Sequence, residues 1–322
     1  MTMTPTRQDT PRRQRAREDK ALARDLVDTV ARVLGSQPGR RVTHADGIVL
    51  TGAFTPTPRA RELSRAAHLQ GDPVPVTVRF SNGFPDPALP DAAEDNPRGM
   101  SVKFHLADGS ATDLVCQSWP VFPAGTPEGF LGLVTAQGEG EQATLDFLAQ
   151  HPDIAEATGR IAAESGQPPV SWATMAFHSM NAFRLVDAYG GSRFVRYTLF
   201  PEKGEHSLPV EQRAQADPHY LMEGVAGELP IRHRVVAQVA GDDDQTTDAS
   251  KGWPDDRERV DLGTIVCTAL DAERDRDSLV YDPTRLVDGI ETSDDPILHI
   301  RPRVYAESVR RRTGAARPAA DG

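Results

Sequence analysis

Hydrophobic residues near the N-terminus recur at three- and four-residue steps, which is the spacing of one face of an amphipathic helix. This pattern runs from about Glu18 to Leu34, and Gly35 follows it as a candidate helix stop. Residues 1–17 are polar and contain proline and arginine without such a period, so we expect a disordered tail there. The apolar face consists of Leu22, Leu26, Val27, Val30, Val33 and Leu34.

The middle of the chain shows the two-residue alternation that is typical of β-strands. In residues 74–81, valine and phenylalanine occupy every second position. Because successive side chains of a strand point to opposite faces, Arg79 and Ser81 are expected to share the face away from the valines. Similar alternation occurs in residues 99–109 and 192–204, and clusters of turn-forming residues separate these runs.

Helical patterns lie between the strands, at about residues 126–136 and 141–165, and the acidic run 242–244 reads as a solvated loop. The prediction is therefore an α+β fold, with an antiparallel sheet or barrel, helical excursions and a closing helix. We expect a core of residues 18–312, followed by a frayed tail at 313–322 that is rich in Ala, Gly, Pro and Arg.

Charge and cysteine content narrow the class of protein. The 322 residues carry a formal net charge of −11, which argues against a nucleic-acid partner because phosphate binding needs a basic face. Two distant cysteines, Cys116 and Cys267, make neither a disulfide framework nor a thiolate metal site. The chain contains no run of eighteen apolar residues and begins with no apolar leader. We therefore expect a cytoplasmic protein that does not associate with membranes.

Three segments, residues 40–54, 77–122 and 278–312, carry the candidate chemistry. Within and between them a set of short motifs occurs in a fixed order. The motifs are Arg-x-x-His-x-x-Gly at 41–47, Arg-Phe-Ser at 79–81, Asn-Pro-Arg-Gly at 96–99 before Val-Lys-Phe at 102–104, Pro-Val-Phe at 120–122, Trp-Pro at 253–254, Asp-Pro, Gly-Ile-Glu and Ser-x-Asp within 282–295, and Arg-x-x-x-Tyr with a further arginine within 301–312.

At these motifs the chain resembles the haem catalases, over about residues 41–312. Each motif is weak by itself, and their occurrence in one order carries the resemblance. It implies an antiparallel β-barrel of the catalase type with helical excursions and a C-terminal helix that holds the haem ligand. It also implies haem b as the cofactor.

The resemblance assigns Tyr305 as the axial ligand of the haem iron, and tyrosine is a known proximal ligand. Arg301 precedes Tyr305 by one helical turn, where its guanidinium would favour a phenolate. Pro302 disfavours helix at the residue before it, which leaves the pairing of Arg301 with Tyr305 open. The arginines that hold the haem propionates in the family are matched here by Arg41, Arg79 and Arg312.

On the distal side, the resemblance makes His44 the group that takes a proton from the iron-bound peroxide oxygen and delivers it to the outer oxygen, which yields an oxoferryl haem. Ser81 resembles the serine that hydrogen-bonds to this histidine and fixes its ring. Phe130 resembles the phenylalanine that packs on the haem face.

The chain departs from the catalase pattern at three places near the expected site. Gln117 stands where catalases have an asparagine, Trp119 is a bulky residue near the expected substrate entrance, and Thr43 precedes His44 where an apolar residue is common. The sequence also ends ten residues after Arg312, whereas catalases continue into a further helical region. These departures favour the small catalase-related peroxidases.

The expected function is therefore a haem peroxidase that reduces hydrogen peroxide or organic hydroperoxides with an outside electron donor and has weak or no catalase activity. Three alternatives stay open: a true catalase, a fatty acid hydroperoxide isomerase of the catalase-like type, and a haem carrier or sensor without activity. Thr43 is the residue that keeps the isomerase open. The expected partners are a small peroxide and an unidentified donor. The resemblance also suggests a homo-oligomer, with a dimer as the guess.

Overall fold

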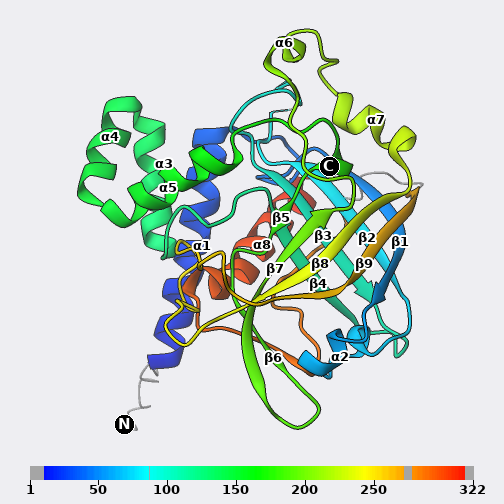
Figure 1. The fold of residues 1–322 in the computed structure, drawn as a ribbon. Coiled ribbons are helices and arrows are strands. Elements are labelled where there is room, and N and C mark those ends of the chain that lie inside the picture. The colour runs from blue at the N-terminus through cyan, green and yellow to red at the C-terminus, as the bar shows by residue number, and fades with distance from the viewer. Residues whose placement is uncertain (1–10, 87, 272–277, 316–322) are drawn as a thin grey trace, which may run out of the picture.

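An antiparallel β-barrel forms the centre of the computed structural model, which describes residues 11–86, 88–271 and 278–315 (Figure 1). Within these residues, eight strands form a closed ring in the order β7, β5, β4, β3, β2, β1, β9 and β8, because β8 pairs again with β7. Strands β6 and β10 extend the sheet outside this ring, through the pairing of β6 with β7. The α+β fold with an antiparallel barrel is thus confirmed.

The strands are β1 (Gly47–Pro56), β2 (Val74–Asn82), β3 (Arg98–His105), β4 (Ala111–Gln117), β5 (Phe177–His178), β6 (Phe183–Val186), β7 (Ser192–Pro201), β8 (Ile231–Val239), β9 (Arg259–Leu270) and β10 (Ile290–Thr292). The helices are α1 (Pro11–Leu34), α2 (Ala60–Leu63), α3 (Pro127–Glu139), α4 (Glu141–Gln150), α5 (Pro152–Ser165), α6 (Val210–Arg213), α7 (Tyr220–Glu228) and α8 (Pro296–Ala315). Short 3-10 turns lie at Ala67–Leu69 and Trp172–Thr174.

The barrel interior holds the main hydrophobic core. The valines of β2 and Phe80 are buried there with Leu50 and Phe54 of β1. Alternation along β2 places Arg79 and Ser81 on the outer face of the barrel wall, where they line a cavity. The two faces predicted for residues 74–81 are therefore confirmed.

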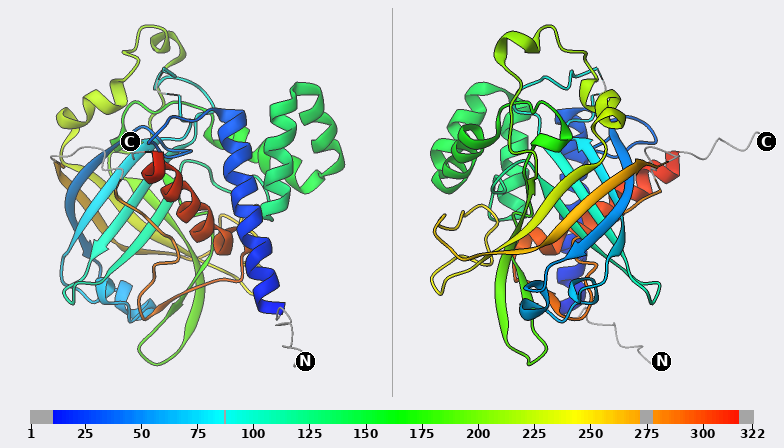
Figure 2. Two further views of the ribbon diagram at one scale, coloured as in Figure 1. Left: turned by 180° about the vertical axis from the view of Figure 1, so that it is seen from behind. Right: turned by 45° about the vertical axis from the view of Figure 1, so that its right-hand side comes forward.

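Three helices lie together against one outer side of the barrel (Figure 2). Helix α1 packs against both α3 and α8, and α3 also contacts α8. Their shared apolar cluster includes Ala23 and Leu26 of α1 and Ile300 of α8. Helices α4 and α5 extend from α3 to the side of the molecule (Figure 1). None of the described helices is long and apolar enough to cross a membrane.

The first helix begins at Pro11, seven residues before the expected start, so the prediction of a disordered tail is wrong for residues 11–17. Proline fits the first turn of a helix, and the arginines after it are good helix formers. A hydrogen bond from Gln14 to Glu18 adds support one turn on. Residues 1–10 lie outside the described residues.

Two other element boundaries differ from the expectation. Helix α8 runs to Ala315, so residues 313–315 belong to the helix and not to a tail, while 316–322 lie outside the described residues. The helical pattern at 141–165 is divided into α4 and α5 at His151. Pro152 explains this break, because proline disfavours helical geometry at the residue before it and suits the first turn of a new helix.

Candidate active site between the barrel and the C-terminal helix

A cavity of about 300 Å³ lies between the outer face of the barrel wall and helices α1, α3 and α8. This volume is in the range of small-molecule and cofactor sites. Ten residues predicted from the sequence as site residues, from five separate parts of the chain, all line it. They are Arg41, Thr43, His44, Arg79, Ser81, Gln117, Phe130, Arg301, Tyr305 and Arg312.

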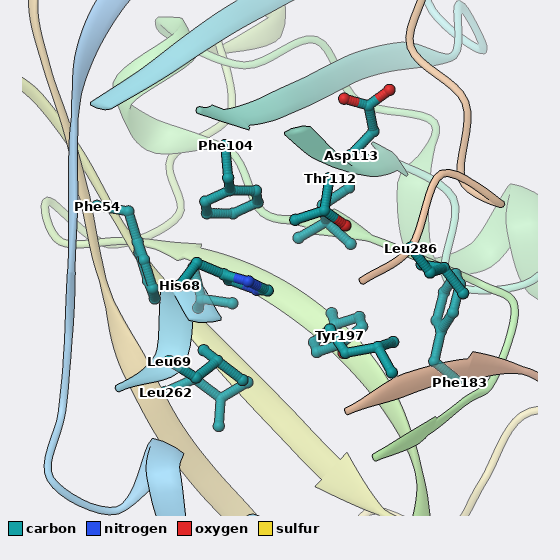
Figure 3. Close-up of a pocket in the computed structure, with 13 residues that line it drawn as sticks. Phe54, His68, Leu69, Phe104, Thr112, Asp113, Phe183, Tyr197, Leu262 and Leu286 are labelled. Atoms are coloured by element: carbon teal, nitrogen blue, oxygen red, sulfur yellow. The ribbon is translucent and has the colours of Figure 1, made fainter. Parts of the chain in front are cut away.

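A second cavity, inside the barrel, is ten times smaller, at about 30 Å³ (Figure 3). Phe54 and Phe104 line it, and the ring of His68 lies among these aromatic side chains. Such a volume holds at most one or two water molecules. Only the outer of these two cavities is large enough for a cofactor.

One wall of the outer cavity is built from neighbouring rungs of the sheet. In one rung Gly47, Ser81, Gly99 and Gln117 lie side by side on four consecutive strands. The next rung on this face contains Arg79 of β2 between Val49 of β1 and Ser101 of β3. Small residues in the first rung leave space in front of the sheet, since a Cβ at Gly99 would lie only 3.0 Å from both His44 Nδ1 and Ser81 Oγ.

His44 occupies the space that Gly99 leaves. It does not open a strand, as expected, but sits in the turn before β1 with a φ of 54°. Its backbone N–H donates to the carbonyl of Gly83 at 2.8 Å, and its Nδ1 lies 3.0 Å from Ser81 Oγ. A hydroxyl at Nδ1 leaves Nε2 as the ring nitrogen available for chemistry.

The surroundings of His44 keep its imidazole neutral. Burial lowers the pKa of His44 to about 3, and the positive charges of Arg79, Arg301 and Arg41 lower it in the same direction. The contact with Ser81 opposes this shift. At neutral pH the ring is therefore free to accept a proton, which is the requirement for a general base.

The opposite wall is one face of α8. Residues of this helix line the cavity at steps of three and four, which is the period of a helix face. Arg301 Nε donates a hydrogen bond of 2.9 Å to the hydroxyl oxygen of Tyr305. The helix continues through Pro302, although proline has no N–H to give to the carbonyl of Leu298. The pairing that Pro302 left open in the sequence is thus present.

A buried polar chain holds Arg301 from behind. Its Nη1 donates to Asn181 Oδ1 at 2.7 Å, and Asn181 Nδ2 donates to Asp295 Oδ2 at 2.8 Å. The other oxygen of Asp295 accepts the backbone N–H of Ile297 at 2.8 Å and so caps α8. Burial raises the pKa of Asp295. Asn181 was missed by sequence reasoning, because it belongs to none of the motifs.

Three arginines from separate segments face the same cavity: Arg41 before β1, Arg79 on β2 and Arg312 near the end of α8. Arg41 Nη2 also donates to the carbonyl of Leu279 at 3.0 Å. This contact joins the first segment to residues 279–281, which line the cavity and were not predicted as site residues.

Aromatic and aliphatic side chains complete the cavity. Phe130 of α3 lies beside Phe122, with ring centroids 4.8 Å apart, and both line the cavity together with Trp119. Helix α1 contributes four aliphatic residues, all from the apolar face predicted in the sequence, which are Leu26, Val27, Val30 and Leu34. The site therefore combines apolar walls with a few polar groups at fixed positions.

A family model described as Catalase matches residues 22–317, which is most of the chain. The chain belongs to the catalase family. A catalase-related peroxidase of Mycolicibacterium paratuberculosis is 40% identical over 301 residues, which cover 91% of this chain and 95% of that protein. A catalase-related peroxidase of Synechococcus elongatus is 28% identical and is covered to 88% of its length.

Solved catalase structures share the fold of this catalase family member. A bacterial catalase superposes with a TM-score of 0.74 at 20% identity, and a fungal catalase with 0.75 at 22% identity. The matched regions cover 88% and 86% of this chain but only 60% of each solved chain. The chain thus spans about 60% of the length of these two solved catalases.

Proposed function

We propose that this chain is a haem-dependent peroxidase that reduces hydrogen peroxide or organic hydroperoxides with an outside electron donor. One observation carries the proposal: a neutral histidine held by Ser81 and a tyrosine paired with Arg301 line one cavity, on two different walls. As a member of the catalase family with catalase-related peroxidases among its relatives, the chain is an oxidoreductase that acts on peroxide.

The residues of the cavity fit a haem. Tyr305 would hold the haem iron through its phenol oxygen. The arginines at positions 41, 79 and 312 offer cations for the two propionates of haem b, and the apolar side chains suit the rest of the macrocycle. When bound, haem would supply the iron at which the O–O bond of the peroxide is cleaved.

His44 would handle the proton of this reaction. Its neutral imidazole would accept a proton from the peroxide and return that proton to the oxygen that leaves as water or alcohol. Ser81 would hold the ring through Nδ1 in one orientation, so that Nε2 faces the substrate. Arg301 would hold the phenol oxygen of Tyr305 in one position through its hydrogen bond.

Sequence identity to the relatives favours peroxidase over catalase activity. A catalase-related peroxidase is 40% identical over 91% of this chain, whereas the solved catalases are 20% and 22% identical. Gln117 and Trp119, which replace the pattern of catalases, both line the cavity. Thr43 lines it as well, which keeps the isomerase as the second candidate.

Oxygen evolution and dye oxidation, both measured per bound haem, test the proposal. We expect dye oxidation with hydrogen peroxide and with an alkyl hydroperoxide, and little oxygen release. Dye oxidation with either peroxide should be slower in His44→Gln. Vigorous oxygen release with little dye turnover would instead support a catalase. A rearranged product from a fatty acid hydroperoxide without any reductant would support the isomerase, and tight haem without any peroxide reaction would support a carrier.

A further inference from the structure

The backbone of His44 depends on the loop that joins β2 to β3. A residue with a side chain rarely adopts a positive φ, so the φ of 54° at His44 must be held by its surroundings. The only backbone hydrogen bond recorded for the N–H of His44 within the described residues goes to the carbonyl of Gly83, at 2.8 Å. The position of Gly83 therefore sets the point from which the imidazole extends.

Asn96 holds Gly83 in place. Its side-chain Oδ1 accepts the backbone N–H groups of both Gly83, at 3.1 Å, and Phe84, at 3.2 Å. Asn96 is 2% exposed, so these are hydrogen bonds shielded from water. Gly83 also packs closely on Pro97, because an added Cβ would lie 2.3 Å from the Pro97 carbonyl oxygen.

A buried cation anchors Asn96 from the other side. Arg98 is fully buried, and its Nη1 donates to the Asn96 carbonyl at 3.0 Å. Its Nη2 donates to the carbonyl of Asp91 at 2.6 Å, and the carboxylate of Asp91 accepts from Asn82 Nδ2 at 2.6 Å. The loop is thus tied to the barrel wall, and Asn96 passes this restraint on to Gly83 through the hydrogen bond of its side chain.

We propose that Asn96 is a positioning residue for His44, which acts through the Gly83 carbonyl and does not touch the substrate. The proposal rests on the proposed function only in that His44 is the acid/base group. The side-chain oxygen of Asn96 is an acceptor that carries no charge. The charged groups that lower the pKa of His44 are Arg79, Arg301 and Arg41.

The first test is an NMR titration of His44 in the haem-free protein, for the wild type, Asn96→Ala and Asn96→Asp. The charged groups that face His44 are Arg79, Arg301 and Arg41, and Ser81 contacts its ring. Without the restraint the ring moves toward solvent and away from these cations, so we expect the pKa of His44 in Asn96→Ala to rise by at least one unit. Asn96→Asp keeps the acceptor and should raise it less.

The second test is a double-mutant cycle with His44→Gln on the haem-loaded protein. Asn96→Ala should lower the rate constant for peroxide reaction about tenfold in the wild-type background and less than twofold in His44→Gln. Asn96→Asp should stay within threefold of wild type at pH 7, because a His44 pKa one unit above 3 still leaves the ring neutral. If Asn96→Asp keeps the rate constant that Asn96→Ala loses, the loss comes from the missing oxygen acceptor and not from a general disturbance of packing.

Ser64→Ala is the matched control, because Ser64 is fully buried and hydrogen-bonded to the Gly289 carbonyl but does not line the cavity. It should lower stability without moving the His44 pKa or the rate. If Asn96→Ala behaves like this control, or lowers the rate equally in both backgrounds, the proposal is overturned.

Should Asn96→Ala not fold, Asn96→Ser undergoes the same tests with the same criteria. A wild type that lacks peroxide reactivity would refute the proposed function, while the NMR titration would still decide the role of Asn96.

Discussion

Arg301 donates a hydrogen bond of 2.9 Å to the hydroxyl oxygen of Tyr305 across one turn of α8. The guanidinium also lies 5.6 Å from the centre of the tyrosine ring. Because Asn181 accepts a second hydrogen bond from the same guanidinium at 2.7 Å, Arg301 is fixed in one orientation. The orientation of the Tyr305 hydroxyl is therefore set by a buried chain of hydrogen bonds that begins at Asp295 and passes through Asn181 and Arg301.

Replacement of Arg301 by glutamine should therefore weaken the hold on the cofactor. Supporting contacts behind a metal ligand are typically worth 10- to 100-fold in affinity, so we expect haem to leave Arg301→Gln about ten times faster than the wild type. Transfer of haem to an excess of apomyoglobin, followed by absorption, measures this rate. Arg303→Gln is the matched control, since Arg303 lies on the same helix but is exposed and pairs with Asp19. Equal rates in both variants would contradict the role of Arg301.

Ser81→Ala should slow the reaction with peroxide without loss of haem. The hydroxyl 3.0 Å from His44 Nδ1 fixes the ring, and a hydrogen bond of this kind is worth about 1 kcal/mol, or roughly fivefold in rate. Stopped-flow absorption of the haem-loaded variant measures the rate constant. A rate equal to that of the wild type would show that Ser81 does not orient the ring.

Gly99→Ala should disturb the same contact by steric pressure. The new methyl group would lie 3.0 Å from both His44 Nδ1 and Ser81 Oγ, so one of them must move. We expect a fall in the peroxide rate of about tenfold or less with haem still bound. Gly224→Ala in α7 is the control, because a Cβ there meets nothing within 4 Å and should add up to about 1 kcal/mol of helix stability.

The protein should lose stability in acid because several histidines are buried as neutral rings. Burial lowers the pKa of His68, which is 6% exposed, to about 4. Between pH 6.5 and 4 the unfolded chain binds a proton that the folded chain does not, so stability falls as the pH falls through this window. At pH 4.5 this single site accounts for about 2 kcal/mol.

His68→Leu should remove that part of the acid sensitivity. Urea unfolding of the variant at pH 7 and pH 4.5 should show a difference in unfolding free energy about 2 kcal/mol smaller than in the wild type. The exposed His206, changed to leucine, serves as the control and should leave the difference unchanged. An unchanged difference in His68→Leu as well would contradict this assignment.

The period-two and helical patterns were sufficient to predict the class of the fold and the two faces of β2. They failed at boundaries, where local chemistry decides: the N-terminal arginines were read as a tail although they are good helix formers, and Pro152 divides one helical pattern into two. Local sequence rules also could not predict that α8 continues as a helix through Pro302. Packing of α8 against α1 and α3 keeps the helix intact despite the missing N–H.

The residues that line the cavity were predictable because the motifs carry them in a fixed order. The residues that hold them in place were not. Asn181 reaches Arg301 from a loop 120 positions away in sequence, and Asn96 acts on His44 through the backbone of Gly83. Such contacts depend on three-dimensional neighbours and leave no spacing in the sequence. The roles of the ten site residues, the oligomeric state, the location in the cell and the intermediate implied by the resemblance stay predictions.

The central claim is that one haem is bound between His44 and Tyr305. The most direct measurement is the absorption spectrum of the haem-loaded protein, for the wild type, Tyr305→Phe and His44→Gln. The account predicts a ferric phenolate spectrum that disappears in Tyr305→Phe and persists in His44→Gln. A spectrum that is the same in Tyr305→Phe as in the wild type would contradict it.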